Sequence, residues 1–399
     1  KLTREQVFFS KCPLRMNYVF SLEGLLPPES KSALCYPPYT PRFPACLRPD
    51  EKILPQILRH DALLFYPFES MDPFLHLVRE ASSDPNVLSI KITIYRLASK
   101  AKLAEYLCAA AENGKEVTVL MELRARFDEQ NNIQWAERME EAGCTILYGT
   151  EGFKVHSKIC LITRRERGKI QYITQVGTGN YNEKTAKQYT DLCLMAARPE
   201  LGEDAAVLFR NMAIANLSGD YKQLLVSPFQ LRDKVMELMD REIKKGSEGY
   251  IFLKLNSITD RKLIDKLAEA SQAGVEVVMN VRGICCIRPG IPGLTDHITI
   301  FSIVGRYLEH TRIYRFGRGD NADLFISSAD FMTRNTERRV EVACPVLDPQ
   351  VRRSIFHICD VLVSDNVKAR QLGPDGQWSP RKTGAAPCSS QDVFLEEGM

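Results

Sequence analysis

A repeated stretch of sequence constrains the fold of this chain more than any other feature. The segment KLAEYLCAAAENGKEV, residues 102–117, aligns without a gap with KLIDKLAEASQAGVEV, residues 262–277. Each copy has apolar residues at helical spacing, a glycine where the helix should end, and a β-rich run after it. Another strand pattern precedes each helix, at residues 88–95 and 250–255. Strand, helix and strand in succession form a βαβ unit, so we predict an α/β fold with a duplicated domain and partly parallel sheets.

The chain is long enough for more than one domain. It has 399 residues, of which 44% are hydrophobic and 26% charged, as in ordinary globular proteins. We predict four segments along the chain. These are the remnant of an upstream domain with an extended, proline-rich connector at 1–52, the two copies at 53–225 and 226–368, and a flexible tail rich in Gly, Pro and Ser at 369–399.

Charge and cysteine content exclude some classes of protein. The net charge is only +3, so local clusters of Arg and Lys, rather than bulk charge, would have to bind any acidic partner. The twelve cysteines show neither C-x-x-C nor zinc-ligand spacing, which is typical of reduced thiols in a cytoplasmic protein. The sequence has no Walker A motif, which argues against a P-loop kinase.

Each copy also carries a histidine two residues before a basic residue, in FKVHSKI and in YLEHTRI. Alternate residues of a strand face the same side, so we predict that His156 and Lys158 face one way, as do His310 and Arg312. A pseudo-twofold relation between the copies would bring two imidazoles and two cations into one cleft. Such a cleft suits a phosphate that one histidine attacks while the other assists.

A polar turn follows each histidine motif, GTGN at residues 177–180 and SSAD at residues 327–330. A glycine-rich turn lets backbone N–H groups approach phosphate oxygens closely. The side chains of Asn180 and Lys184 would add hydrogen-bond donors. We therefore predict that these turns border the same phosphate site.

The paired motifs H-x-K and G-[ST]-x-N resemble those of the phospholipase D superfamily, whose two halves share one active site. The chain departs from that pattern at Thr163, where the superfamily usually has Asp, and at Arg312, which replaces Lys. A closer resemblance is to the polyphosphate kinase family, and it covers most of the chain from about residue 10 to residue 370. The family's motifs appear in order as YPFES, KITIYR, RARFDE, KVHSK, GTGNYNEKTAKQYTD, VRG, SIVGRYLEH, SSADFMTRN and EVACPVLDP.

This resemblance implies two phospholipase D-like α/β domains, each a mixed sheet flanked by helices, with a shared cleft. It also implies reversible transfer of the terminal phosphate of ATP to polyphosphate, giving ADP, through a phosphohistidine. His156 would be the phosphorylated nucleophile and His310 the nearby acid/base and nucleotide-phosphate contact. Lys158 and Arg312 would supply positive charge to the catalytic site.

The resemblance further implies an ATP site and a magnesium–phosphate site. Tyr189 and Arg282 match ATP-binding positions, and Arg96 and Arg126 match positions assigned to Mg²⁺ and phosphate. A guanidinium has no lone pair, so we expect these two arginines to hold phosphate oxygens that also bind the metal. The implied partners are ATP and inorganic polyphosphate rather than nucleic acid. The implied setting is a cytoplasmic homo-oligomer that can associate peripherally with a membrane.

Two alternatives stay open at the level of sequence. The first is a phospholipase D-like phosphodiesterase, which would cleave a diester of a lipid or nucleic acid and need no metal. The second is an inactive fragment that binds polyphosphate, because the family's upstream region helps to hold the adenine and build the dimer.

Overall fold

The structure is a computed structural model that describes residues 3–13, 15–123, 129–149 and 152–397. It divides the chain into two compact units, Lys1–Thr40 and Pro41–Met399. The larger unit therefore begins before residue 53, the start predicted for the first copy. No helix in the described ranges is long and apolar enough to span a bilayer.

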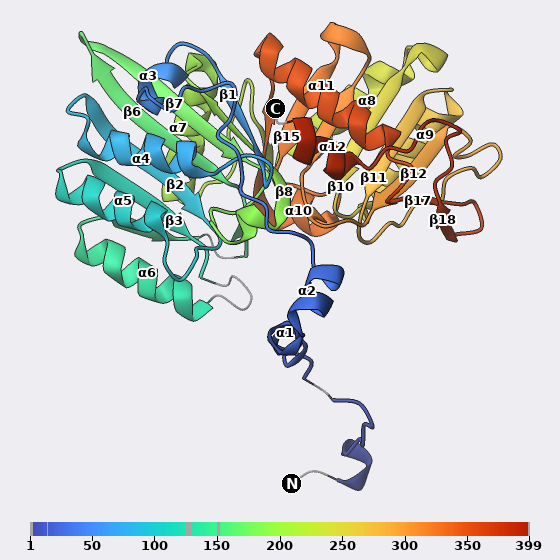
Figure 1. Cartoon of the computed structure of the whole chain (residues 1–399). Coiled ribbons are helices and arrows are strands. Elements are labelled where there is room, and N and C mark those ends of the chain that lie inside the picture. The colour runs from blue at the N-terminus through green and yellow to red at the C-terminus, as the bar shows by residue number, and fades with distance from the viewer. Residues whose placement is uncertain (1–2, 14, 124–128, 150–151, 398–399) are drawn as a thin grey trace. The chain divides into compact units, whose positions relative to one another are not determined.

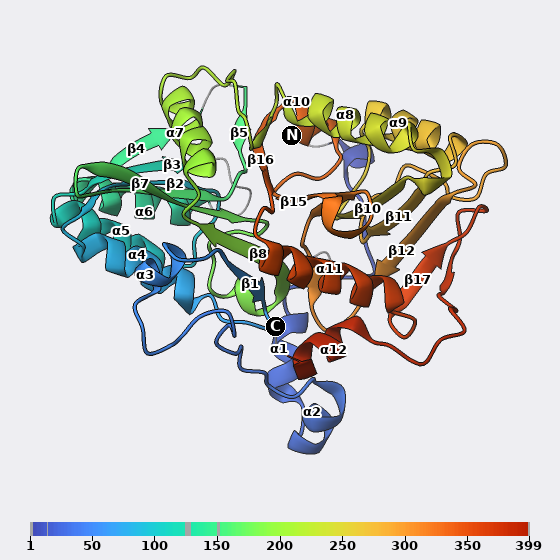
Figure 2. The same cartoon turned by 90° about the horizontal axis from the view of Figure 1, so that it is seen from above.

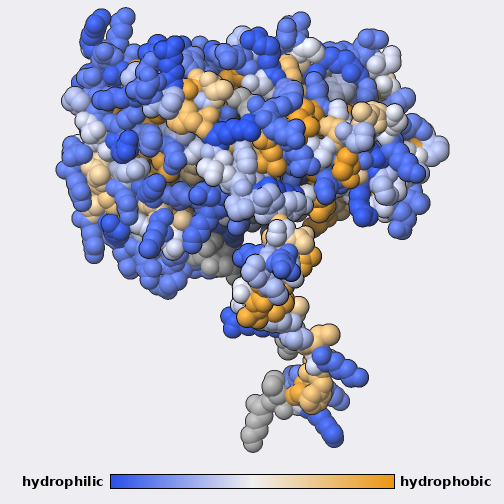
Figure 3. Space-filling model, in the orientation of Figure 1, coloured by the Kyte–Doolittle hydropathy of each residue, from blue (hydrophilic) through white to orange (hydrophobic). Residues whose placement is uncertain are grey.

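The smaller unit consists of short helices without a core of their own. They are a 3-10 turn at Arg4–Gln6, α1 (Val19–Leu22), a second 3-10 turn at Glu23–Leu25 and α2 (Pro28–Leu34). None of their residues is buried. Phe9 and Phe20 are 97% and 88% exposed, and Figure 3 shows hydrophobic surface along this segment.

The larger unit contains two mixed sheets with the same strand order, which confirms the predicted duplication (Figure 1). The first has the order β4-β3-β2-β6-β7-β8-β1, and the second has the order β12-β11-β10-β14-β15-β16-β9. In each, the first three strands are parallel and the others antiparallel. The strands of the first sheet are β1 (Ala62–Tyr66), β2 (Val87–Ile94), β3 (Glu116–Met121), β4 (Thr145–Tyr148), β6 (Ile159–Glu166), β7 (Lys169–Gly177) and β8 (Tyr189–Ala196). Those of the second are β9 (Leu225–Ser227), β10 (Tyr250–Leu255), β11 (Glu276–Val281), β12 (Ile298–Ile303), β14 (Ile313–Phe316), β15 (Asp323–Ser327) and β16 (Arg339–Pro345).

Helices cover both faces of each sheet. The first sheet is covered by α3 (Ile53–Ile57), α4 (Asp72–Ser83), α5 (Lys102–Glu112), α6 (Glu129–Glu141) and α7 (Pro199–Ala213). The second is covered by α8 (Leu231–Ile243), α9 (Arg261–Gln272), α10 (Thr333–Glu337) and α11 (Pro349–Ser364), and α12 (Ser390–Glu397) packs against α11. Figure 2 shows α7 on the opposite face from α4 and α5, and α11 on the opposite face from α8 and α9. Short 3-10 turns occur at Thr185–Lys187, Gly246–Glu248 and Gly319–Asn321.

The repeated helices α5 and α9 form where their sequences predict them. Asp260 caps α9 by accepting hydrogen bonds from the backbone N–H groups of Lys262 and Leu263. Just beyond the helices, Gly114 and Gly274 have φ of 78° and 88°, a conformation that costs glycine little. Local sequence therefore sets the length of each helix.

The two sheets also exchange short strands, a feature that the sequence did not predict. The two-residue strand β5 (Lys154–Val155) belongs to the first half but pairs with β16 of the second. Conversely, β13 (Leu308–Glu309) belongs to the second half but pairs with β8 of the first. Figure 2 shows β5 beside β16. The prediction that His156 and Lys158 are alternate residues of one strand was therefore wrong, because both lie between β5 and β6, where the chain changes sheets.

The C-terminal segment is not the flexible tail that its composition predicted. Strand β17 (Ala369–Leu372) pairs with β12, and β18 (Trp378–Pro380) pairs with β17. Phe394 of α12 is 2% exposed, and its ring centroid lies 5.1 Å and 5.3 Å from those of Phe65 and Phe68. Burial of one aromatic side chain of this kind stabilises a fold by about 1.5–3 kcal/mol. Most of the Gly, Pro and Ser residues lie in loops between these short elements. A helix as short as α12 shows little periodicity in sequence.

Candidate active site

His156 follows β5 and lies against a buried carboxylate of the other half. Its Nδ1 is 2.9 Å and 3.0 Å from the two carboxylate oxygens of Glu341, on β16. Burial raises the pKa of Glu341, and the charge of Lys158 opposes that shift. The ionised carboxylate only accepts, so with Glu341 ionised Nδ1 carries the hydrogen and Nε2 keeps its lone pair. The side chains of Ser328 and Asn335 donate to the same carboxylate at 2.5 Å and 2.7 Å. Glu341 is thus held by three donors and in turn orients the imidazole.

His310 follows β13 and has the equivalent arrangement. Its Nδ1 is 2.9 Å from each carboxylate oxygen of Asp191, on β8. The hydroxyl of Thr178 donates to Asp191 at 2.6 Å. Nδ1 of His310 therefore also carries the hydrogen, and its Nε2 lies 3.2 Å from a guanidinium nitrogen of Arg312.

The two carboxylates occupy equivalent positions in the duplicated fold, although the sequence prediction missed both. Asp191 and Glu341 are each the third residue of their strand, and each accepts a hydrogen bond from the second residue of a polar turn, Thr178 or Ser328. Strand exchange explains why each histidine meets the carboxylate of the opposite half. The signal available in the sequence was one acidic residue at the third position of two mostly apolar strands.

The turn GTGN contributes a close approach to one of these carboxylates. A Cβ placed on Gly179 would lie 2.1 Å from Oδ2 of Asp191, far inside van der Waals contact. The equivalent residue of the second copy is Ala329, which is fully buried without such a conflict. Only glycine therefore fits at position 179 while Asp191 holds His310.

The two imidazoles share one site but have different electrostatic surroundings. Burial, followed by the charge of Lys158, holds the pKa of His156 well below its ordinary value, and the charge of His310 contributes to the same shift. Burial also lowers the pKa of His310, but Asp191 opposes that shift. Burial tends to raise the pKa of Asp191, yet the charge of His310 and hydrogen bonds bring it below its ordinary value. His156 is therefore held neutral, and His310 is the imidazole better able to accept a proton.

The predicted cations Lys158 and Arg312 are both buried beside the histidines. Lys158 donates from Nζ to the backbone carbonyl of His156, and burial lowers its pKa to about 7. Arg312 donates to the carbonyl of His310 at 2.9 Å and to Asp330 at 3.0 Å. The structure thus brings both cations to the site, although the residues that carry them lie between strands rather than along one.

The predicted nucleotide contacts Tyr189 and Arg282 border His310. The ring centroid of Tyr189 lies 5.3 Å from that of His310. Arg282 follows β11 and donates from Nε to Asn256 at 2.5 Å. Asn256 in turn donates to the carbonyl of His310 at 3.2 Å. The ends of β10 and β11 in the second half and the start of β8 in the first half therefore meet beside His310.

The remaining predicted residues differ in how closely they approach the two histidines. Arg96 follows β2, with its guanidinium 5.7 Å from the ring centroid of Tyr95, and that ring lies 4.8 Å from His156. Asn180 follows Gly179, and among the described residues its buried Oδ1 has no hydrogen-bond partner. Lys184 is exposed, and no hydrogen bond or ion pair in the described ranges joins it to a histidine. Arg126 lies outside the described residues.

The described residues do not fit a magnesium ion held by the protein alone. Within these ranges, no three side chains among His, Cys, Asp and Glu are grouped so that they could hold a metal ion. Arg96 is a cation without a lone pair. Mg²⁺ would therefore enter the site bound to the phosphates of the nucleotide substrate.

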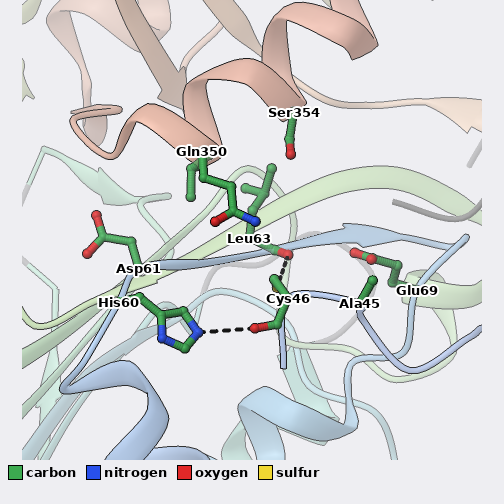
Figure 4. A pocket seen from close by; sticks show the side chains of 9 residues that line it. Ala45, Cys46, His60, Asp61, Leu63, Glu69, Gln350 and Ser354 are labelled. Carbon is green, nitrogen blue, oxygen red and sulfur yellow. Dashed lines mark hydrogen bonds between the residues drawn. The ribbon is translucent and has the colours of Figure 1, made fainter. Parts of the chain in front are cut away.

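A separate pocket contains none of the predicted site residues (Figure 4). Its volume is about 280 Å³, and it is lined by Ala45, Cys46, His60, Asp61, Leu63, Glu69, Gln350, Val351 and Ser354. The Glu69 side chain is 3% exposed and accepts a hydrogen bond from the backbone N–H of Phe65 at 2.7 Å. Burial raises the pKa of Glu69 to about 8.

Glu69→Gln is expected to stabilise the protein above pH 8 and to have little effect below pH 4.5. The folded-state pKa, about 8, lies above the ordinary 4.5. The contribution of Glu69 to the free energy of unfolding is therefore fully present below pH 4.5 and is lost as the pH rises through 8. The loss should reach about 3–5 kcal/mol, at about 1.4 kcal/mol per pKa unit, and a neutral amide avoids it. Urea unfolding of the wild type and of Glu69→Gln, below pH 4.5 and above pH 8, measures the difference in the free energy of unfolding. If that free energy changed with pH equally in both proteins, the raised pKa of Glu69 would be contradicted.

Comparison with known proteins places the chain in a family. Residues 52–218 match the family described as polyphosphate kinase C-terminal domain 1, and residues 224–391 match polyphosphate kinase C-terminal domain 2. The chain is 45% identical to a polyphosphate kinase of Bacillus cereus over 94% of its own length and 54% of that protein. It is 41% identical to a polyphosphate kinase of Pseudomonas aeruginosa, over 96% of its own length and 57% of that protein.

Solved structures agree with this assignment. The chain superimposes on the crystal structure of polyphosphate kinase from Porphyromonas gingivalis with a TM-score of 0.85 and 36% identity, over 93% of this chain and 57% of that one. Phosphatidylserine synthase of Haemophilus influenzae shares the fold, with a TM-score of 0.53 and 12% identity, over 78% of this chain and 87% of that one. The chain thus spans little more than half the length of the polyphosphate kinases it matches. It belongs to the polyphosphate kinase family and comprises the two C-terminal domains of that family.

Proposed function

We propose that this chain transfers the terminal phosphate of ATP to polyphosphate through a phosphohistidine at His156, and that the transfer is reversible. Relatives named polyphosphate kinase support the overall reaction. The observation that carries the proposal is the pair of anchored imidazoles in one site, with His156 neutral and His310 paired with an ionised carboxylate. Such unequal environments are typical of a nucleophile and an acid/base acting together.

In the first step, the Nε2 lone pair of His156 attacks the γ-phosphorus of ATP. The P–N bond forms as the bond from the γ-phosphorus to the bridging oxygen breaks, and ADP leaves with that electron pair. The imidazole gains positive charge, which Glu341 stabilises through Nδ1–H. Lys158 and Arg312 provide positive charge beside the equatorial oxygens of the phosphoryl group in the transition state.

In the second step, a terminal oxygen of polyphosphate attacks the phosphorus held by His156. The P–N bond breaks, its electron pair returns to Nε2, and the polymer is longer by one phosphate. Attack by ADP instead would run the first step backwards. His310, when protonated, donates from Nε2 to an oxygen of the nucleotide phosphates, and Asp191 stabilises that imidazolium.

The proposal assigns the remaining predicted residues to binding. Tyr189, Arg282, Asn180 and Lys184 hold the nucleotide, and the arginines at 96 and 126 hold phosphate oxygens that carry Mg²⁺. The proposal also includes a cytoplasmic homo-oligomer that can associate peripherally with membranes, with ATP and polyphosphate rather than nucleic acid as ligands.

Labelling with radioactive ATP tests the proposal. Acid-labile protein label is expected from γ-labelled ATP with Mg²⁺, and none from α-labelled ATP. The label should disappear in His156→Ala and persist in His297→Ala, which removes an exposed histidine outside the site. Absence of label from a folded protein that still binds polyphosphate would refute catalysis by this chain. Cleavage of a diester substrate without ATP would instead favour the phosphodiesterase.

A further inference from the structure

The C-terminal helix α12 reaches the His310 segment through one buried side chain. Gln391 is 2% exposed. Its Oε1 accepts from the backbone N–H of Tyr307 at 2.9 Å, and its Nε2 donates to the carbonyl of Tyr307 at 2.9 Å and to Glu309 at 2.7 Å. The amide therefore pairs with the main chain of this segment on both its donor and acceptor sides. A carboxylate of the same shape would lose two donors and face Glu309 as a like charge.

The hydrogen bonds continue from Glu309 to the His310 dyad. The hydroxyl of Thr190 donates to Glu309 at 3.1 Å. The backbone N–H of His310 donates to the same hydroxyl at 3.1 Å. Thr190 directly precedes Asp191 in β8. A chain of side-chain hydrogen bonds thus links Gln391 to the backbone of both members of the dyad.

The second copy also carries a buried ion pair that the first copy lacks. Glu309 lies 2.9 Å from Nζ of Lys254, and both side chains are 2% exposed. The equivalent residues of the first copy are Val155 and Thr93, which are uncharged. A buried ion pair costs stability unless its remaining lone pairs are hydrogen-bonded. Gln391 donates one of these hydrogen bonds to Glu309, so a side chain of α12 helps to satisfy the buried carboxylate.

Neighbouring residues leave room for the Gln391 side chain and fix the start of its helix. A Cβ on Gly305 would lie 2.5 Å from Oε1 of Gln391, so glycine is what lets the amide reach Tyr307. The start of α12 is held separately by Asp365, which accepts hydrogen bonds from the backbone N–H and the hydroxyl of Ser390 at 2.8 Å and 2.7 Å. Docking of the helix and contact with the His310 segment therefore use different side chains.

We propose that Gln391 is a positioning residue that sets β13 on β8 and so holds His310 against Asp191. This inference rests on the proposed function for its effect on catalysis, because it assigns His310 a part in phosphoryl transfer. It makes α12 a part of the active site's framework, although α12 follows His310 by 80 residues in sequence.

Nuclear magnetic resonance of histidine side chains tests the inference without turnover. The chain has six histidines, so a ¹⁵N-histidine spectrum can be assigned with single His→Gln variants. Gln391→Met keeps the length of the side chain and removes the amide. We expect the Nδ1–H signal of His310 to broaden or vanish in this variant, while that of His156 persists. Ser390→Ala is the matched control, because it weakens the start of α12 and keeps Gln391.

Kinetics supply the second readout. Gln391→Met is expected to lower kcat for ATP-to-polyphosphate transfer by about 10- to 100-fold, with a smaller change in KM for ATP. An unchanged His310 signal in Gln391→Met, or an equal loss of that signal in Ser390→Ala, would overturn the inference. Gln391→Ser gives the same comparison if the Met variant does not fold. Loss of the His310 signal in Gln391→Met alone, in a protein that shows no kinase activity, would refute the proposed function while supporting the positioning role.

Discussion

Glu341→Gln is expected to abolish measurable phosphohistidine formation and to lower ATP-to-polyphosphate turnover by about 10³- to 10⁴-fold, the size of effect seen when the carboxylate behind a catalytic histidine is neutralised. In the wild type, Nδ1 of His156 donates to Glu341, which leaves Nε2 free to attack. A glutamine can present its NH₂ group to Nδ1, which would favour the tautomer with hydrogen on Nε2. The nucleophilic lone pair would then point away from the substrate.

Asp191→Asn is the matched variant, because it makes the same chemical change to the other dyad. We expect it to keep γ-phosphate labelling of His156 and to slow turnover by about 10²- to 10³-fold, since it removes support from an acid/base rather than from the nucleophile. Rapid-quench labelling with γ-labelled ATP, alongside steady-state polyphosphate synthesis, measures both effects. Equal loss of labelling in the two variants would contradict the division of roles between the histidines.

Gly179→Ala is expected to reduce turnover by at least about 100-fold, because a displacement of about 1 Å at a catalytic group has effects of that size. The added Cβ would lie 2.1 Å from Oδ2 and 2.3 Å from Cγ of Asp191, so the carboxylate must move. Asp191 is also held by Thr178 and His310, and a shift would break or lengthen those hydrogen bonds. We expect the spectroscopic signal of His310 Nδ1–H to change with activity.

Ala329→Gly is the control for this prediction, because it makes the reverse change at the equivalent turn of the second copy. It removes a buried methyl group and creates no clash, so we expect stability to fall by about 1 kcal/mol or more and turnover to stay within a few-fold of the wild type. Thermal unfolding and the polyphosphate assay, run on both variants, separate the two effects. A fully active Gly179→Ala protein would show that Asp191 can move without cost.

Much of the fold could be predicted from local sequence. The two repeated helices, their glycine ends and their flanking strands follow from hydrophobic periodicity and from glycine's tolerance of positive φ. The duplication predicted two like sheets, and the sheets have one strand order. The motifs around His156 and His310 also predicted two imidazoles in one site, since each copy must place its motif at an equivalent point.

The partners of these histidines depended on contacts between residues far apart in sequence. Strands β5 and β13 have only two residues each, and their sequence resembles the continuation of the next strand, so no local pattern shows that they pair with the opposite sheet. Local sequence also does not reveal the partners of Gln391, because its hydrogen bonds to Tyr307 and Glu309 join residues more than 80 positions apart.

By itself, therefore, the sequence determined the two repeated helices with the strands that flank them, that the α/β domain is duplicated, and that the two histidine motifs occupy equivalent places. The tertiary structure alone decided that Glu341 serves His156, that Asp191 serves His310, and that the C-terminal helix packs into the larger unit. The physical reason is that helix ends and hydrophobic faces are set by neighbours in sequence. Strand exchange, hydrogen-bond partners and the charge state of a buried imidazole are set by whichever groups the complete fold brings within a few ångströms.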